Sequence, residues 1–300
     1  MANEQHTYRA MILDYITWNA HPAIYDGFVE IRWYGLFFVI GFAFGYYLVG
    51  KMFKHEGKPE SWLDILLLYL FIATLVGARL GHCLFYQWDY YSQHPIEILK
   101  VWEGGLASHG GAIGIIIAMW IFSRRVTHEN VLWILDRIVV PIAFVGMLIR
   151  LGNLMNHEIY GHATDVPWAF RFILNIPAWE QGAAPIYSAP SHPTQLYEAG
   201  AYLLLFILLM YMYWRRHAEQ RPGLLLGVFF IGTFLSRFFI EFVKNDQVAF
   251  EAGMTFNMGQ WLSIPFVAAG IWLVVRAMRR PPIPIRYADD KDKPVHKNKG

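Results

Sequence analysis

A histidine set among small residues is the first candidate for chemistry in this chain. His109 lies between Ala107 and Gly110. A histidine titrates near neutrality, so it can serve as a general base toward a thiol, whose pKa is about 8.5. The alternative is a histidine that only packs, because Gly110 and Gly114 form the Gly-x-x-x-Gly pattern of close helix pairs. The residue types leave both interpretations open.

Arg150 is a candidate for phosphate binding. It ends a long apolar stretch and is followed by Asn153 and Asn156. A guanidinium group offers two parallel donors and a charge that it cannot lose, which suits a phosphodiester. The alternative is an arginine that snorkels to lipid headgroups without specificity. Snorkelling does not require neighbouring amides, so the two asparagines favour the phosphate site.

Arg237 and Glu241 are four residues apart in another apolar stretch. On a helix this spacing places them on one face, where they can form an ion pair. The pair could be purely structural, or Glu241 could hold Arg237 against an anionic headgroup, and these interpretations are compatible. Arg79, inside a further apolar stretch, is interpreted as a structural or snorkelling charge.

Other classes of site are disfavoured. His157 and His162 are five residues apart, whereas the zinc motif His-Glu-x-x-His needs four, so we expect no metal site. Cys83 is the only cysteine, which excludes an intrachain disulfide and a cysteine-based zinc site. The net charge of +2 predicts no general attraction to nucleic acid.

The composition indicates that a membrane holds these residues in place. The chain is 56% hydrophobic and 16% charged, against roughly 45–50% and about 25% in soluble domains. A membrane-spanning helix needs about 20 mostly apolar residues. Seven stretches meet this requirement: Trp33–Gly50, Ile65–Trp88, Gly105–Ser123, Val131–Ile149, Ala199–Trp214, Gly223–Ile240 and Met258–Val275. The fifth needs 195–198 as its first turn. We therefore predict an all-α membrane protein, a polytopic bundle of seven helices.

Basic residues predict the orientation of this bundle. If the N-terminus is outside, the inner segments hold 16 Lys and Arg and the outer segments hold 5. Such an excess marks the cytoplasmic side. We therefore predict a periplasmic N-terminus and a cytoplasmic C-terminus. The ionisable candidates then gather near the outer ends of four helices, which predicts a polar site at the outer leaflet.

Composition and charge along the chain also predict its domain organisation. We predict that residues 1–280 form one seven-helix transmembrane domain. The connection 151–192 lies outside and is rich in proline and aromatic residues, so we predict a small folded periplasmic cap. Residues 281–300 combine four prolines with alternating charge. We predict that they form a disordered basic cytoplasmic tail.

With these motifs in order, the chain resembles the prolipoprotein diacylglyceryl transferase family along roughly residues 25–280. The matching segments occur in the expected order and are Arg32–Gly35, Gly77–Gly81, Trp102–Gly111, Arg150–Gly161, His192–Glu198, Arg237–Phe242 and Met258–Pro265. Some positions depart from the family pattern. Ile149 and His157 stand where relatives often carry Gly, Thr233 where they often carry Tyr, and Lys244 where Arg is common.

The resemblance implies a bacterial inner-membrane transferase whose site faces the periplasmic leaflet. Its substrates would be phosphatidylglycerol, drawn from the membrane lipids, and the signal peptide of a prolipoprotein with its lipobox cysteine. The products would be a thioether-linked diacylglyceryl cysteine and glycerol-1-phosphate, formed without metal or cofactor. His109, Arg150 and Arg237 match catalytic positions. The substrate-binding positions, which include Arg150, are matched also by Tyr34, Asn153, Glu158, Gly161, His192 and Glu241.

Two rival functions remain from the residues alone. One is a transporter or receptor that binds an anionic lipid without chemistry. The other is a different enzyme of phospholipid headgroups, which would not require a thiol acceptor.

Overall fold

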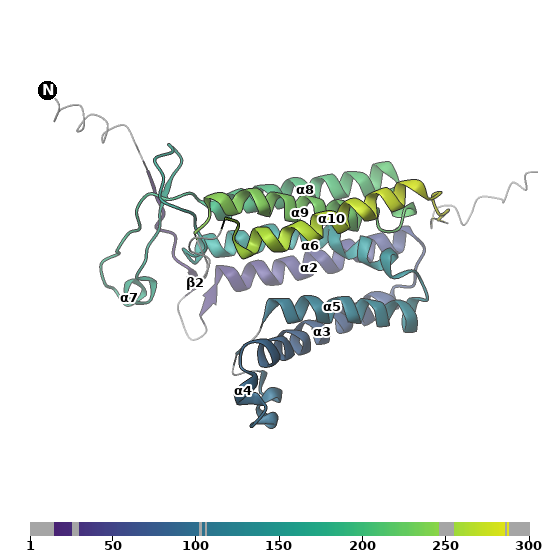
Figure 1. Cartoon of the computed structure of the whole chain (residues 1–300), viewed down its shortest axis with the longest axis horizontal. Helices are drawn as coiled ribbons and strands as arrows, with labels where there is room; N and C mark the ends of the chain where they lie inside the picture. Colours follow the sequence, from purple (N-terminus) through teal and green to yellow (C-terminus); the bar gives the residue numbers. More distant parts are fainter. Residues whose placement is uncertain are drawn as a thin grey trace, which may run out of the picture.

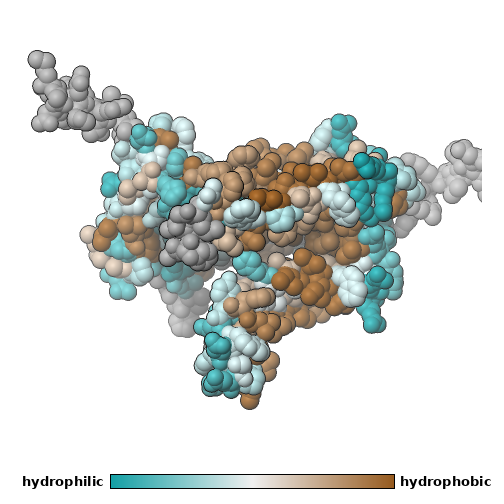
Figure 2. Space-filling view, in the orientation of Figure 1, coloured by the Kyte–Doolittle hydropathy of each residue, from teal (hydrophilic) through white to brown (hydrophobic). Residues whose placement is uncertain are grey.

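Seven helices are long and apolar enough to cross a membrane. The computed structural model describes residues 15–25, 30–101, 104–105, 107–245, 255–285 and 287. Within these residues the seven predicted spans are confirmed. They are α2 (Trp33–His55), α3 (Ser61–Phe85), α5 (Ser108–Phe122), α6 (Val131–Met155), α8 (Thr194–Arg216), α9 (Leu224–Ile240) and α10 (Met258–Arg279). As expected, α8 includes residues 195–198 in its first turn. Figure 2 shows the hydrophobic band that these helices present between two hydrophilic ends.

The helices form two groups, which we call the arm (α3 and α5) and the body (α2, α6, α8, α9 and α10). Figure 1 shows the arm beside the body, with the short helix α4 (Trp88–Tyr91) at one end of the arm. We name the two ends of the bundle by the predicted orientation, so that α4 lies at the outer end and the C-terminal residues lie at the inner end. The body has a core of its own, which includes Leu48, Val140 and Leu225. A second core joins the arm to the body, with Leu66 of α3 and Phe122 of α5 against residues of α2 and α6.

Glycines allow the two arm helices to pack at close range. A Cβ atom on Gly110 would lie 2.2 Å from the carbonyl oxygen of Gly77 and 2.6 Å from Cα of Gly81. The same atom on Gly114 would lie 2.5 Å from the carbonyl oxygen of Ala73. The packing interpretation of the Gly110/Gly114 pattern is therefore confirmed.

The connection between the arm helices is anchored by Arg79. Its guanidinium donates to the carbonyl oxygens of Glu97, Ile98 and Gly104 at 2.5, 2.9 and 2.7 Å. These bonds hold the short helix η1 (Pro95–Leu99) and the segment that leads into α5. Arg79 is buried, so of its two earlier interpretations the structural one fits and the snorkelling one does not.

The connection after α6, where we predicted a cap at 151–192, contains short regular elements. Helix α6 continues to Met155, so the cap begins after that residue rather than at 151. It contains β4 (Phe170–Arg171) and α7 (Ile176–Glu180). The strand β1 (Ile16–Thr17) pairs in parallel with β4, which brings the N-terminal segment into the cap. The short strands β2 (Ala23–Tyr25) and β3 (Ile31–Arg32) pair with each other before α2.

The inner end carries the helix η4 (Ala218–Gln220) and the first residues of the tail. We predicted disorder from residue 281. Residues 281–285 and 287 have no regular structure, but they dock on the inner face: the Ile283 amide donates to the Gln220 carbonyl at 2.8 Å. Residues 286 and 288–300 lie outside the described residues, where the prediction stays untested.

We predict that Gly110→Ala destabilises the arm. The new methyl group would collide with backbone of α3, and such overpacking typically costs about 1–3 kcal/mol of unfolding free energy. Thermal unfolding of the purified protein measures the effect. Gly200→Ala on α8 is the matched control, because a Cβ there meets nothing within 4 Å. Equal melting temperatures for the two variants would contradict the close helix contact.

Candidate active site

Arg150 lies inside the body near its outer end and is held by α8. Its Nε atom pairs with a carboxylate oxygen of Glu198, and its Nη1 donates to Asn153 at 3.2 Å. The Tyr202 hydroxyl also contacts the guanidinium. The Arg150 side chain is 17% exposed and that of Glu198 is 3% exposed. A buried carboxylate partner fixes this arginine, so it is not a charge that snorkels freely to headgroups.

Ion pairs continue from Glu198 across the bundle. Lys244 Nζ lies 3.0 Å from Glu198 and 3.4 Å from Glu241. Arg237 Nε lies 3.3 Å from the same oxygen of Glu241, as predicted from the spacing of these two residues. We call this set the ion-pair chain, and it consists of Arg150, Glu198, Lys244, Glu241 and Arg237. With three cations and two carboxylates, it carries a net charge of +1.

The ion-pair chain depends on how the ends of α9 and α10 are built. Glu241 begins the helix η5 (Glu241–Val243), which directly follows α9. Asn257 caps α10 with its side-chain oxygen, and its amide nitrogen donates to Glu241 at 3.0 Å. At Gly259, a Cβ atom would lie 2.7 Å from a Glu241 oxygen. The start of α10 thus gives Glu241 both a donor and the space to lie there.

Several predicted substrate-binding residues surround Arg150. Asn153 donates to Glu158 at 2.8 Å, so Glu158 fixes the amide that contacts the arginine. Tyr34 packs over α6, where a Cβ on Gly152 would lie 2.6 Å from its ring. These contacts bring Tyr34, Asn153 and Glu158 to the same end of the body as Arg150.

Gly161 lies beside Lys244, and His192 lies beside Gly161. Gly161 pairs with Lys244 in an antiparallel bridge, and a Cβ on it would lie 2.1 Å from the Val243 carbonyl oxygen. His192 accepts the Gly161 amide at its carbonyl, while its Nδ1 lies 3.1 Å from the Tyr197 hydroxyl. Burial, together with neighbouring His162, lowers the pKa of His192. Gly161 therefore allows two backbone segments to approach closely, and the contacts that we see for it are with other protein residues.

His157 has a structural explanation. It adopts a φ of +57°, a left-handed conformation that glycine adopts most easily. This fits the departure at a position where relatives often carry Gly. Its Nε2 lies 2.8 Å from the Ala20 carbonyl and its Nδ1 accepts the Ile173 amide at 3.1 Å. Burial lowers the pKa of His157. Both ring nitrogens are used in holding the cap together.

His109 lies apart from the ion-pair chain. It is exposed in the first turn of α5, on the arm. Among the described residues, no hydrogen bond or ion pair connects it to Arg150 or Arg237. The structure therefore brings Arg150, Arg237 and Glu241 together but leaves His109 on the other helix group.

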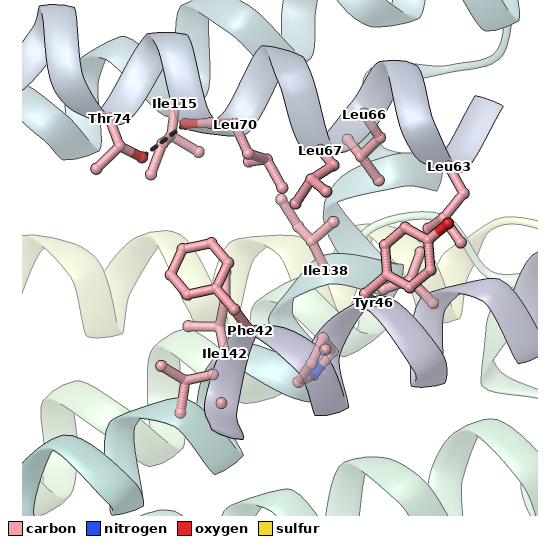
Figure 3. Close-up of a pocket in the computed structure, with 15 residues that line it drawn as sticks. Phe42, Tyr46, Leu63, Leu66, Leu67, Leu70, Thr74, Ile115, Ile138 and Ile142 are labelled. Carbon is pink, nitrogen blue, oxygen red and sulfur yellow. Dashed lines mark hydrogen bonds between the residues drawn. The ribbon is translucent and has the colours of Figure 1, made fainter. Parts of the chain in front are cut away.

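Between arm and body lies an apolar cleft. Figure 3 shows Leu67 and Leu70 of α3 on one side, with Phe42 and Ile142 of the body on the other. A second cavity, of about 190 Å³, lies on α6, α8 and α9, and it is lined by Arg150, Tyr202 and Thr233 among others. Ile142 lines both spaces. The Thr233 hydroxyl is buried without a partner in the described part of the chain. Ile142 thus adjoins both the apolar cleft and the cavity beside Arg150.

Sequence reasoning missed four residues of this site. Glu198 and Lys244 were assigned no role, although they join the two arginines, and Tyr202 and Asn257 were not singled out. Glu198 and Lys244 are 46 residues apart in the chain. The available signal was the presence of charged residues beside apolar spans, which could have marked Glu198 and Lys244.

Comparisons with known proteins agree on one family. Residues 22–276 match the family model for prolipoprotein diacylglyceryl transferase. A protein of Porphyromonas gingivalis is 49% identical over 280 residues, which cover 89% of this chain and 96% of that protein. One of Tolumonas auensis is 46% identical, covering 86% and 96%, and one of Chloroherpeton thalassium is 45% identical, covering 89% and 96%. All three are named phosphatidylglycerol–prolipoprotein diacylglyceryl transferase.

Lys244 gives a test of the ion-pair chain. We predict that Lys244→Met, which keeps a long side chain without charge, lowers the unfolding free energy by about 3–5 kcal/mol, because two buried carboxylates lose their shared cation. The melting temperature of the purified protein measures this. Lys244→Arg is the matched control and should melt near wild type, since it keeps the charge. If both variants melt alike, Lys244 does not balance the two carboxylates.

Proposed function

Because this chain belongs to the prolipoprotein diacylglyceryl transferase family, we propose that it transfers the diacylglyceryl group of phosphatidylglycerol to prolipoproteins. The acceptor is the thiol of the lipobox cysteine in the signal peptide. The reaction forms a thioether and releases glycerol-1-phosphate, the first step of lipoprotein maturation.

The net charge of the ion-pair chain is the observation that carries this proposal. A phosphodiester bears one negative charge, which balances the +1 of the chain. Arg237 is the most exposed of the three cations, at 36% of its side chain, and its contact with Glu241 uses Nε. Its terminal nitrogens and those of Arg150 can therefore donate to the phosphate oxygens, as arginines do at phosphate sites.

The transfer then has a simple atomic balance. The cysteine sulfur attacks the glyceryl carbon, a carbon–sulfur bond forms, and the bond from that carbon to the phosphate oxygen breaks. Negative charge grows on the leaving phosphate, where Arg150 and Arg237 stabilise it. The thiol gives its proton to His109, which acts as general base. We expect no metal or cofactor to take part.

His109 reaches the reaction from the arm. Since it lies apart from the ion-pair chain, the substrates themselves must bridge the two helix groups. The apolar cleft between arm and body is suited to acyl chains, because its lining consists mostly of Leu, Ile, Val and Phe side chains (Figure 3). The lipid would lie in this cleft with its phosphate at Arg150 and its glyceryl carbon toward His109.

Seven apolar helices make this a multi-pass membrane protein, and its family is one of the bacterial inner membrane. We further propose that the site faces the periplasmic leaflet, with the N-terminus periplasmic and the C-terminus cytoplasmic. Residues 1–280 would act as one catalytic domain, and the tail from 281 would lie on the cytoplasmic side.

Product release tests the function. Purified enzyme should release glycerol-1-phosphate only when phosphatidylglycerol and a lipobox peptide are both present, and the peptide should gain the mass of a diacylglyceryl group. A peptide with serine in place of the cysteine is the control and should give no product. Lipid binding without release would favour a transporter or receptor, and release with the serine peptide would favour another headgroup enzyme.

The same product assay tests the role of His109 as the base. His109→Asn should fold normally and release little product at neutral pH, with partial recovery at alkaline pH, where more of the thiol is ionised. Turnover near wild type at neutral pH would leave His109 as a packing residue.

In right-side-out vesicles, added peptide should be modified without permeabilisation if the site faces the periplasm.

We predict that Arg150→Lys inserts normally but loses about tenfold or more in turnover. A lysine cannot pair with Glu198 and also present a planar pair of donors to a phosphate, and each 1.4 kcal/mol or so of lost stabilisation is about a factor of ten in rate. Arg150→Ala should be worse. Turnover by the product assay measures both variants. Wild-type turnover in Arg150→Lys, with failure of Arg150→Ala, would mean that charge alone suffices.

A further inference from the structure

A second polar pocket lies at the inner end of the bundle, opposite the active site. Its volume is about 350 Å³. Three inner connections and the tail converge on it, with Glu56 and Lys58 after α2, Glu129 before α6, and Glu219 in η4. Residues 283–285 line another side of it.

Glu56 has every partner that it needs. Arg137 donates to its two oxygens at 2.9 and 2.8 Å, Tyr213 donates at 2.6 Å, and Trp133 donates at 2.8 Å. Lys58 forms an ion pair with Glu129. These two carboxylates of the pocket are therefore balanced by cations.

Glu219 differs from both of them. It is 1% exposed, and one of its oxygens accepts from the Tyr287 hydroxyl at 2.5 Å and lies 3.2 Å from His217 Nδ1. The other oxygen, Oε2, is buried and has no partner among the described residues. Among the described residues, the pocket and the partners of its carboxylates comprise three carboxylates (Glu56, Glu129 and Glu219) and two cations (Lys58 and Arg137). A buried charge without a partner is costly, so a donor with positive charge would be stabilised there.

The pocket already favours cations. Lys58 Nζ lies 5.2 Å and the Arg137 guanidinium 4.7 Å from the centre of the Trp133 ring, and Trp133 lines the pocket. An aromatic ring attracts cations through its electron-rich face. The described residues contain no group of three His, Cys, Asp or Glu side chains suited to a metal ion. An organic cation with N–H donors fits this environment better than a metal.

The tail residues close the pocket. Ile283 is fixed by its hydrogen bond to Gln220, and the Tyr287 ring lies 4.6 Å from that of His55. Burial and the bond to Glu219 raise the pKa of Tyr287 to about 12, so this hydroxyl remains a donor. It thereby keeps one oxygen of Glu219 occupied, so a ligand would pair with the buried Oε2, which it reaches only when the side chains that cover this oxygen move.

We propose that this inner pocket binds a primary ammonium group, with the Glu219 carboxylate as its partner. A phosphatidylethanolamine headgroup of the inner leaflet and a free small amine carry the same ammonium group. The site is separate from the ion-pair chain, so it can be occupied or empty whatever reaction takes place at the outer end.

Thermal unfolding of the full-length protein in detergent tests the proposal. Ethylammonium chloride should raise the melting temperature in a saturable way, because a ligand that binds the folded state stabilises it. Tetramethylammonium chloride at the same ionic strength, which has no N–H donor, should not. Equal shifts with both salts, or no shift with either, would overturn the proposal.

Variants identify the carboxylate. Glu219→Gln should lose the ethylammonium response, whereas Glu129→Asp, which keeps a carboxylate beside Lys58 in the same pocket, should keep it. An unchanged response in Glu219→Gln would overturn the assignment. If Glu219→Gln does not fold, the contrast between the two salts in the wild-type protein still decides.

Lipid nanodiscs separate the two sources of the ammonium group. If the lipid is the ligand, phosphatidylethanolamine discs should raise the melting temperature above that in phosphatidylcholine discs and abolish the ethylammonium response. A response that persists in phosphatidylethanolamine discs supports a free amine. Neither readout uses the transfer reaction, so failure here is independent of the proposed function.

Discussion

The pairing of buried charges at the outer end of the body is the interaction on which the site depends. Glu198, Lys244 and Glu241 are each largely buried, and an unpaired charge in such a place would cost several kcal/mol. Each of these three residues must therefore lie close to a residue of opposite charge. Since Arg150 and Arg237 are the ends of this chain of pairs, the arrangement fixes two arginines from different helices at one level of the membrane. It also leaves one positive charge in excess, which is what an anionic substrate requires.

The division into arm and body leaves a space beside this excess positive charge. The arm packs tightly within itself through Gly77, Gly81, Gly110 and Gly114, and it joins the body through the core near Phe122. An apolar cleft remains between the two groups. In the function that we propose, the lipid lies between the arginines of the body and His109 of the arm. In this account the protein supplies the phosphate site and the base from opposite sides, and the substrates complete the centre.

Local patterns were sufficient to predict much of the fold. Apolar length gave the seven spans, because a helix must satisfy its own backbone in lipid. The spacing of Arg237 and Glu241 predicted their ion pair, and the spacing of Gly110 and Gly114 predicted a helix-packing face. All of these depend on residues near one another in the chain.

Contacts between distant segments could not be predicted in this way. The pairing of Lys244 with Glu198 and that of β1 with β4 depend on how separate elements meet. The left-handed conformation of His157 depends on hydrogen bonds to residues 20 and 173. The docking of residues 281–285 and 287 depends on polar partners on other elements, whereas their composition alone resembles that of a disordered tail.

Affinity for phosphatidylglycerol in Arg237→Gln is the most direct test of the central claim. Without this cation the ion-pair chain is neutral, so we expect binding to weaken about tenfold, which corresponds to about 1.4 kcal/mol. Binding to a protein in nanodiscs, measured without acceptor peptide, separates this effect from turnover. The double variant Arg237→Gln/Glu241→Gln, whose chain again carries one excess positive charge, should recover part of the affinity. Unchanged affinity in Arg237→Gln would show that the excess charge does not hold the phosphodiester.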